Sequence, residues 1–81
     1  MIIILRWAEY RDNKGNPLTA FVVARDDNLI LLSYKMSGKI HQEWFHADYL
    51  ASDLIGSAKK PKDYNKYYRH AIIGLFEEDE E

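Results

Sequence analysis

Three side chains able to bind a metal ion, His41, Glu43 and His46, lie close together in the sequence. A zinc site needs three or four ligands that converge on one ion. On a β-strand successive side chains point to opposite faces, so His41 and Glu43 would share a face while His46 would lie on the other. The spacing therefore predicts polar residues on the wet face of a strand and at its exit, with no metal site and no cofactor.

Covalent catalysis would require an activated serine, cysteine or lysine beside a base. The chain contains no cysteine, its four glycines are scattered singly, and no Gly-x-Ser-x-Gly sequence is present. The acidic pairs Asp26 with Asp27 and Asp48 with Asp53 are typical of solvated turns and caps. The serines occur where strands and turns ordinarily use this residue: Ser33, Ser37, Ser52 and Ser57. We therefore expect a protein that is not an enzyme.

A basic and aromatic stretch spans residues 59–70. Its cations are Lys59, Lys60, Lys62, Lys66 and Arg69. These cations could contact phosphates while neighbouring tyrosines stack on bases, which predicts a nucleic-acid-binding segment as one alternative. Helical spacing would instead put Tyr64, Tyr67 and Tyr68 on a buried stripe and leave the cations on an ordinary wet face.

Five acidic residues end the chain: Glu77, Glu78, Asp79, Glu80 and Glu81. They follow the basic stretch closely, so charge is segregated although the net charge of the whole chain is only −2. Such a strip could engage a basic surface on a partner protein, or it could simply be a solubilising end. We treat residues 77–81 as an acidic tail behind a single globular domain of residues 1–76.

Four segments rich in β-branched and aromatic residues are expected to be strands: 2–11, 18–25, 29–35 and 39–45. Turn signals separate them, among them Asp12–Pro17 and Ser37–Gly38. The connections are too short for helical crossovers, so the strands should form an antiparallel meander. The apolar run Ile2–Leu5 is too short for a signal-peptide core and has no positive charge before it, so we interpret it as a buried strand.

The predicted strands carry apolar side chains on both faces. In the first strand Ile3, Leu5 and Trp7 would face one way and Ile4 and Tyr10 the other, and the next two strands are similarly two-sided. An open sheet with one wet face should alternate more cleanly. The sheet must therefore curl into a barrel with extra cover, or be covered by a helix or by a second chain. A self-associating structural subunit is an alternative that follows from this pattern.

The period of the apolar pattern changes near the C-terminus. The spacing of one helix face is shown by Tyr64, Tyr67, Tyr68, Ala71, Ile72 and Leu75. Pro61 suits a first helical turn, although Gly74 weakens a helix and residues 67–76 could instead form a strand. A short helical turn at 47–50 and a connection at 53–57 precede this segment. The predicted fold class is mainly β (α+β), with four to five strands in a small antiparallel meander or barrel and a C-terminal helix.

The stretch Gly38–Leu54, GKIHQEWFHADYLASDL, resembles part of the Src-homology-three-like barrels. A turn glycine, a strand ending in aromatic residues, a one-turn helix and a polar exit match the distal hairpin and final helical turn of that family. Arg6–Tyr10 is similar to the family's first strand. The resemblance implies a small, strongly bent SH3-like β-barrel. The tandem tryptophan and the proline expected near His46 are missing, so the proline-peptide groove of the family is not carried over.

The sequence also bears on location and partners. No segment approaches the roughly 20 apolar residues needed to span a bilayer, and the lack of cysteine fits a reducing, cytoplasmic environment. We expect a small protein-binding module, of the kind found among compact prokaryotic and phage-encoded inhibitors and regulators, that occludes a partner's surface. Tryptophan and tyrosine dominate interface hot spots. The expected contact residues are therefore Trp7, Trp44, Phe45 and Tyr49, together with the acidic tail.

Overall fold

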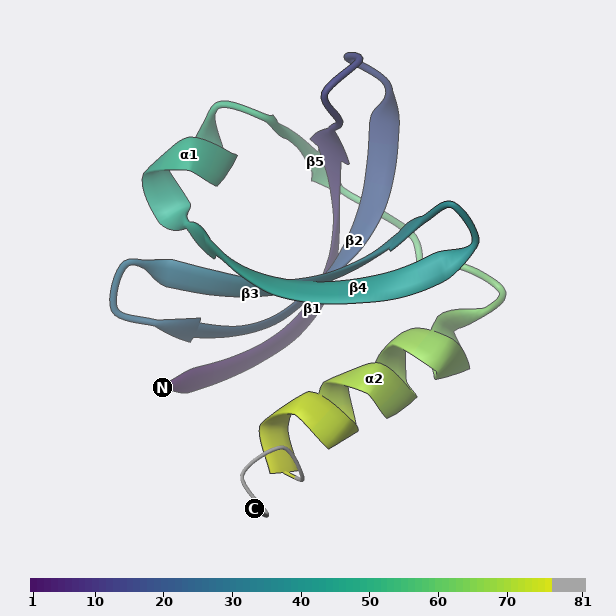
Figure 1. The fold of residues 1–81 in the computed structure, drawn as a ribbon. Coiled ribbons are helices and arrows are strands. Elements are labelled where there is room, and N and C mark those ends of the chain that lie inside the picture. The colour runs from purple at the N-terminus through teal and green to yellow at the C-terminus, as the bar shows by residue number, and fades with distance from the viewer. Residues whose placement is uncertain (77–81) are drawn as a thin grey trace.

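The computed structural model describes residues 1–76 as five β-strands and two α-helices (Figure 1). In chain order they are β1 (Ile2–Arg11), β2 (Pro17–Asp26), β3 (Leu29–Met36), β4 (Lys39–His46), α1 (Ala47–Ala51), β5 (Leu54–Ser57) and α2 (Tyr64–Phe76). The mainly β class and the C-terminal helix are confirmed. The segment 53–57, expected to be a connection, contains β5 instead. Its four residues are too few to show an alternating pattern, and pairing with β1 makes them a strand.

All neighbouring strands are antiparallel, in the order β4-β3-β2-β1-β5. The first four form the predicted meander. β4 and β5 lie at opposite edges of the sheet, and the chain passes from one to the other through α1 (Figure 1). The architecture is broadly SH3-like, but β4 does not pair with β5. The sheet is therefore open and does not close into the barrel that the resemblance implied.

Two adjacent β-bulges bend the sheet. Ile4 and Leu5 of β1 together oppose Val23 of β2, and Val23 is in turn the extra residue of β2 against β3. Bulges increase the local twist and bend the strands that carry them. Leu5 has a left-handed backbone with a φ of 54°, which is unfavourable for a residue with a Cβ atom. The curvature visible in Figure 1 follows from these irregularities.

Turn chemistry sets the register of the meander. Ser37 and Gly38 between β3 and β4 both have positive φ, 55° and 79°, as a type I′ hairpin turn requires. In the turn between β1 and β2, Asp12 Oδ1 accepts hydrogen bonds from the backbone N–H groups of Lys14 at 2.9 Å and Asn16 at 2.8 Å. These local bonds hold the ends of the paired strands together.

Both faces of the sheet are apolar and buried, as the sequence pattern predicts, and the chain's own helices cover them. On the face that α1 covers, called the α1 face, the core consists of Ala8, Tyr10, Ala20, Val22, Leu32 and Leu50. On the opposite α2 face it consists of Phe21, Val23, Ala24, Leu31, Tyr67 and Ala71. Figure 1 shows the two helices on opposite sides of the sheet.

Aromatic packing holds α2 against the sheet. The Trp7 ring centroid lies 4.6 Å from that of Phe21 and 5.0 Å from that of Tyr67 on α2. Such ring pairs stabilise a fold beyond the area they bury. Lys35 Nζ also lies 3.0 Å from Asp63 Oδ2 just before the helix, and this ammonium group lowers the pKa of the Asp63 carboxyl. The exposed ion pair adds little stability, so the aromatic contacts dominate.

The first half of β1 is less covered than predicted. Ile4 packs against the α1-face core, but Ile2, Ile3 and Leu5 are 66%, 46% and 55% exposed. β5 is too short to reach this end of the strand, because it pairs with β1 only over Ala8–Tyr10. Ile2–Leu5 is part of a strand as predicted, but the prediction that it is buried is wrong for Ile2, Ile3 and Leu5.

Leu31 and Leu32 test whether both faces are true cores, because each is only 4% exposed and they lie on opposite faces. Replacing either with alanine should lower the free energy of unfolding by about 2–5 kcal/mol. Leu54→Ala is the control, since Leu54 is 52% exposed, and it should change stability by less than about 0.5 kcal/mol. Urea denaturation measures all three. If one core variant resembles the control, the face it belongs to is not packed.

Candidate functional site

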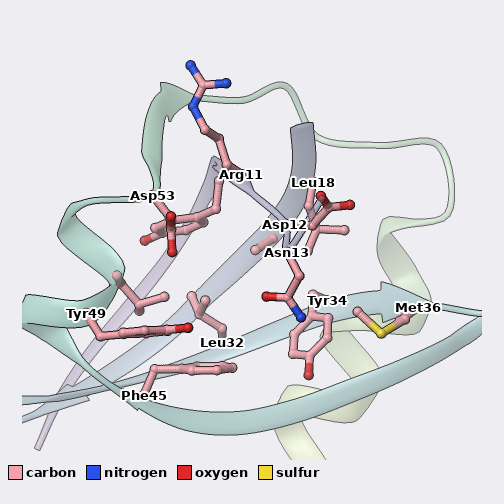
Figure 2. A pocket seen from close by; sticks show the side chains of 13 residues that line it. Arg11, Asp12, Asn13, Leu18, Leu32, Tyr34, Met36, Phe45, Tyr49 and Asp53 are labelled. Carbon is pink, nitrogen blue, oxygen red and sulfur yellow. The ribbon is translucent and has the colours of Figure 1, made fainter. Parts of the chain in front are cut away.

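A pocket of about 160 Å³ opens on the α1 face (Figure 2). Its floor includes the nearly fully buried core side chains of Ala20, Leu32 and Leu50. Four aromatic residues surround this floor: Tyr10, Tyr34, Phe45 and Tyr49. Polar rim residues come from the end of β1, the turn after it and the chain after α1: Arg11, Asp12, Asn13 and Asp53. The pocket thus combines an apolar interior with a polar entrance.

Backbone hydrogen bonds hold the segments around the pocket in place. The N–H of Arg11 donates to the carbonyl of Asp53 at 2.8 Å, which ties the end of β1 to the chain after α1. The N–H of Ala47 donates to the carbonyl of Asn28 at 2.8 Å, which ties the start of α1 to the turn between β2 and β3. Asp12 organises the adjacent β1–β2 turn through its side chain. Because these hydrogen bonds fix the segments around the pocket before a ligand arrives, less conformational entropy is lost on binding.

Two tyrosines that line the pocket, Tyr10 and Tyr34, have raised pKa values. Burial raises the pKa of Tyr10. Burial also raises the pKa of Tyr34, as do its hydrogen bond to Glu43 and the negative charge of that carboxylate. The Tyr34 hydroxyl donates to Glu43 Oε2 at 3.1 Å, and its ring stacks on His41 with centroids 5.5 Å apart. Both hydroxyls therefore stay protonated well above neutral pH and suit recognition rather than proton abstraction.

Figure 2 shows how the opening is arranged. Tyr49 and Phe45 lie on one side of it, and Asn13 and Tyr34 lie on the other, while the Arg11 side chain extends away. Tyr49 is 62% exposed, so much of its ring faces solvent beside the buried floor. Apolar walls with a few polar groups at the entrance are typical of binding sites.

The structure divides the four predicted contact aromatics between the two faces. Phe45 and Tyr49 line the pocket on the α1 face. Trp44 is 41% exposed and pairs across the strands with Leu31, which places it on the α2 face. Trp7 packs between the sheet and α2. The fold therefore brings two of the four together and directs the other two elsewhere.

The basic stretch surrounds the start of α2. All five predicted cations are exposed: Lys59, Lys60, Lys62, Lys66 and Arg69. The neighbouring tyrosines are buried or half-buried in the fold. Tyr67 is buried, Tyr64 and Tyr68 are half-buried, and Lys60 Nζ lies 4.1 Å from the centre of the Tyr64 ring. The exposed cations of this stretch could contact phosphates, but its tyrosines are not exposed for stacking on bases. Nucleic-acid binding by this stretch stays a prediction.

The acidic tail, residues 77–81, lies outside the described residues.

The three residues considered as metal ligands in the sequence, His41, Glu43 and His46, do not converge on one point. His41 and Glu43 both contact Tyr34, whereas His46 is exposed at the N-cap of α1. Across the part of the chain that the structure describes, no three histidine or acidic side chains gather as metal ligands would. His41 and Glu43 therefore act here as neighbours of a pocket tyrosine.

Of the thirteen residues that line the pocket, only Phe45 and Tyr49 were predicted from the sequence as contact residues. The missed residues include all those that bring polar groups to the pocket besides Tyr49: Tyr10, Arg11, Asp12, Asn13, Tyr34 and Asp53. They come from three separate segments, and only strand pairing and the passage through α1 bring these segments together. One signal was available in the turn sequence Asp12–Pro17. A turn of this kind pairs the residues on either side of it, so Tyr10 had to lie opposite Leu18.

Comparison of this chain with protein-family models, curated proteins and solved structures found no match. Neither helix in residues 1–76 has the length and apolar character to cross a lipid bilayer. The geometry of the pocket is therefore the basis for assigning a function.

Replacing Glu43 with glutamine should lower the pKa of Tyr34, because a neutral amide no longer repels the tyrosinate. The pKa should remain above its ordinary value because burial persists. The pKa of Tyr10 is raised by burial alone and should not change, which makes Tyr10 an internal control. Ultraviolet difference titration, with NMR to assign the two rings, measures both values. An unchanged pKa for Tyr34 would mean that Glu43 does not contact it in solution.

Proposed function

We propose that this chain is a protein-binding module whose α1-face pocket receives one side chain of a partner protein. The observation that carries the proposal is the position of Tyr49, which is 62% exposed yet set beside a floor of buried core side chains. An exposed ring at the mouth of an apolar pocket gains contact area when a partner's side chain enters. Aromatic residues in such positions contribute much of the binding energy of protein interfaces.

The volume of the pocket limits what it can hold. Pockets for drug-sized ligands and cofactors measure about 300–1,000 Å³, whereas this one is about 160 Å³. An apolar cavity of about 150 Å³ holds a ring the size of benzene. A single aromatic or branched aliphatic side chain is therefore the ligand that fits.

The rim can recognise the chain that carries the inserted side chain. Asn13 offers an amide donor and an amide acceptor at the opening. The carboxylates of Asp12 and Asp53 outnumber the guanidinium of Arg11, which extends away from the pocket. This weakly acidic rim favours a partner segment that has a basic residue near the apolar one. The acidic tail suggests the same partner chemistry.

Binding of this kind would act on the partner sterically. A domain of 9.5 kDa that seats itself on a larger protein covers the surface around the inserted side chain. No chemical step is required of the small domain. An inhibitor or regulator that works by occlusion is therefore the role we propose.

Replacing Tyr49 with alanine should weaken peptide binding at least about tenfold, because it removes the exposed wall of the pocket. The probes are peptides selected from a phage-displayed random library on the immobilised full chain, then synthesised and titrated by isothermal calorimetry. Trp44→Ala is the matched control, since Trp44 is also an exposed aromatic residue but lies on the α2 face. It should change Kd by less than about twofold.

A variant that ends at Phe76 separates the pocket from the acidic tail. The proposal expects this variant to bind the peptides with nearly the affinity of the full chain. NMR shift changes on peptide addition should centre on Tyr10, Leu32 and Tyr49. Loss of binding on tail removal would refute the pocket as the main site, as would equal weakening by Tyr49→Ala and Trp44→Ala.

A further inference from the structure

Exposed apolar side chains are concentrated at one edge of the sheet. Nine large hydrophobic residues are exposed among residues 1–71, and six of them lie on β1, just before it or on β5. The six are Met1, Ile2, Ile3, Leu5, Leu54 and Ile55. β1 and β5 together form the edge opposite β4. An exposed apolar edge strand is a template for pairing with another strand.

The outer side of β1 is open only along its first half. β5 pairs with β1 over Ala8–Tyr10, and the N–H of Ala58 donates to the carbonyl of Trp7 at 3.3 Å. No strand of the described chain lies along the outer side of Ile2–Arg6. A strand placed there must end before it reaches β5. The opening therefore accepts the end of a strand, paired over about the length of Ile2–Arg6.

The two edges of the sheet are protected differently. β4 carries many polar and charged side chains: Lys39, His41, Gln42, Glu43 and His46. Charged side chains on an edge strand discourage pairing with other chains. The run Ile2–Leu5 contains only aliphatic residues, with no charge, proline or glycine. One edge is therefore protected against association and the other is not.

Leu5 lies at the β-bulge of β1. Its φ of 54° is left-handed, as the first residue of some bulges is, and its side chain is 55% exposed. The outward-turned side chain adds an aliphatic group to the exposed edge.

We propose that Ile2–Arg6 pairs antiparallel with the same segment of a second copy of this chain, forming a two-fold homodimer with one continuous sheet. Antiparallel pairing about a two-fold axis is self-complementary in its backbone hydrogen bonds. The uncharged aliphatic side chains of one copy meet those of the other, and each strand end fills the opening beside the other copy's short β5. The pocket lies at the far end of β1, beside Tyr10, so it stays open in the dimer.

Sedimentation velocity of the full chain, from micromolar to near-millimolar concentrations, tests this dimer. The unmodified chain should show a monomer–dimer equilibrium. Ile3→Lys should raise the dimer Kd roughly 100-fold, because the dimer contains the substitution twice and each copy contributes about tenfold. Trp44→Lys is the matched control. Trp44 is 41% exposed against 46% for Ile3 but lies on β4, at the opposite edge of the sheet, so the Kd should not change.

Hydrogen exchange on the unmodified chain gives a second measurement that needs no variant. Amides within Ile2–Arg6 should exchange more slowly at high protein concentration, while those of β4 should not change. A chain that stays monomeric throughout overturns the proposal, as does a dimer that Ile3→Lys leaves intact. A dimer that dissociates at high salt also overturns the proposal, because such a dimer would be held by attraction between the acidic segment of one chain and the basic segment of the other. None of these measurements depends on the pocket or its ligand.

Discussion

Burial of both faces of one sheet is the constraint on which the rest of this structure depends. The first three strands carry apolar side chains on either side, and a chain of 81 residues has few elements to cover them. α2 covers one face through Tyr67, which packs on Trp7, and α1 covers the other through Leu50. The bulges around Val23 bend the sheet, and in the bent sheet α1 lies over one face while β5 pairs with β1. The later elements α1, β5 and α2 thus complete the sheet or cover one of its two apolar faces.

Coverage is incomplete at two places, and both follow from short elements. α1 has only five residues and leaves a pocket on the α1 face beside Tyr49. β5 has only four residues and leaves the outer side of Ile2–Arg6 unpaired. The candidate binding site and the apolar edge therefore have one physical origin. A larger domain would have enough chain to cover both, because the buried fraction of the surface rises with size.

The groups around the pocket suit recognition. Tyr10 and Tyr34 have raised pKa values and keep their protons, the Tyr34 hydroxyl donates to Glu43, and Asn13 and Asp53 bring polar groups to the rim. The two proposals would reinforce each other. A dimer joined through β1 would carry two pockets, and a partner with two matching segments would bind the second one intramolecularly. Such linkage raises overall affinity without any new contact.

Local sequence patterns were enough to place most of the secondary structure. Segments rich in β-branched and aromatic residues between turn signals identified four strands. The spacing of Tyr64, Tyr67 and Ala71 favoured the helix that became α2. Both patterns depend only on neighbours along the chain. Burial depends on which distant segment lies opposite, so only the tertiary structure decided it. Trp7 and Tyr49 had the same standing as predicted contact residues, yet α2 packs over Trp7 while Tyr49 is 62% exposed. β5, the bulge at Val23 and the pocket likewise required the pairing partners that the fold supplies.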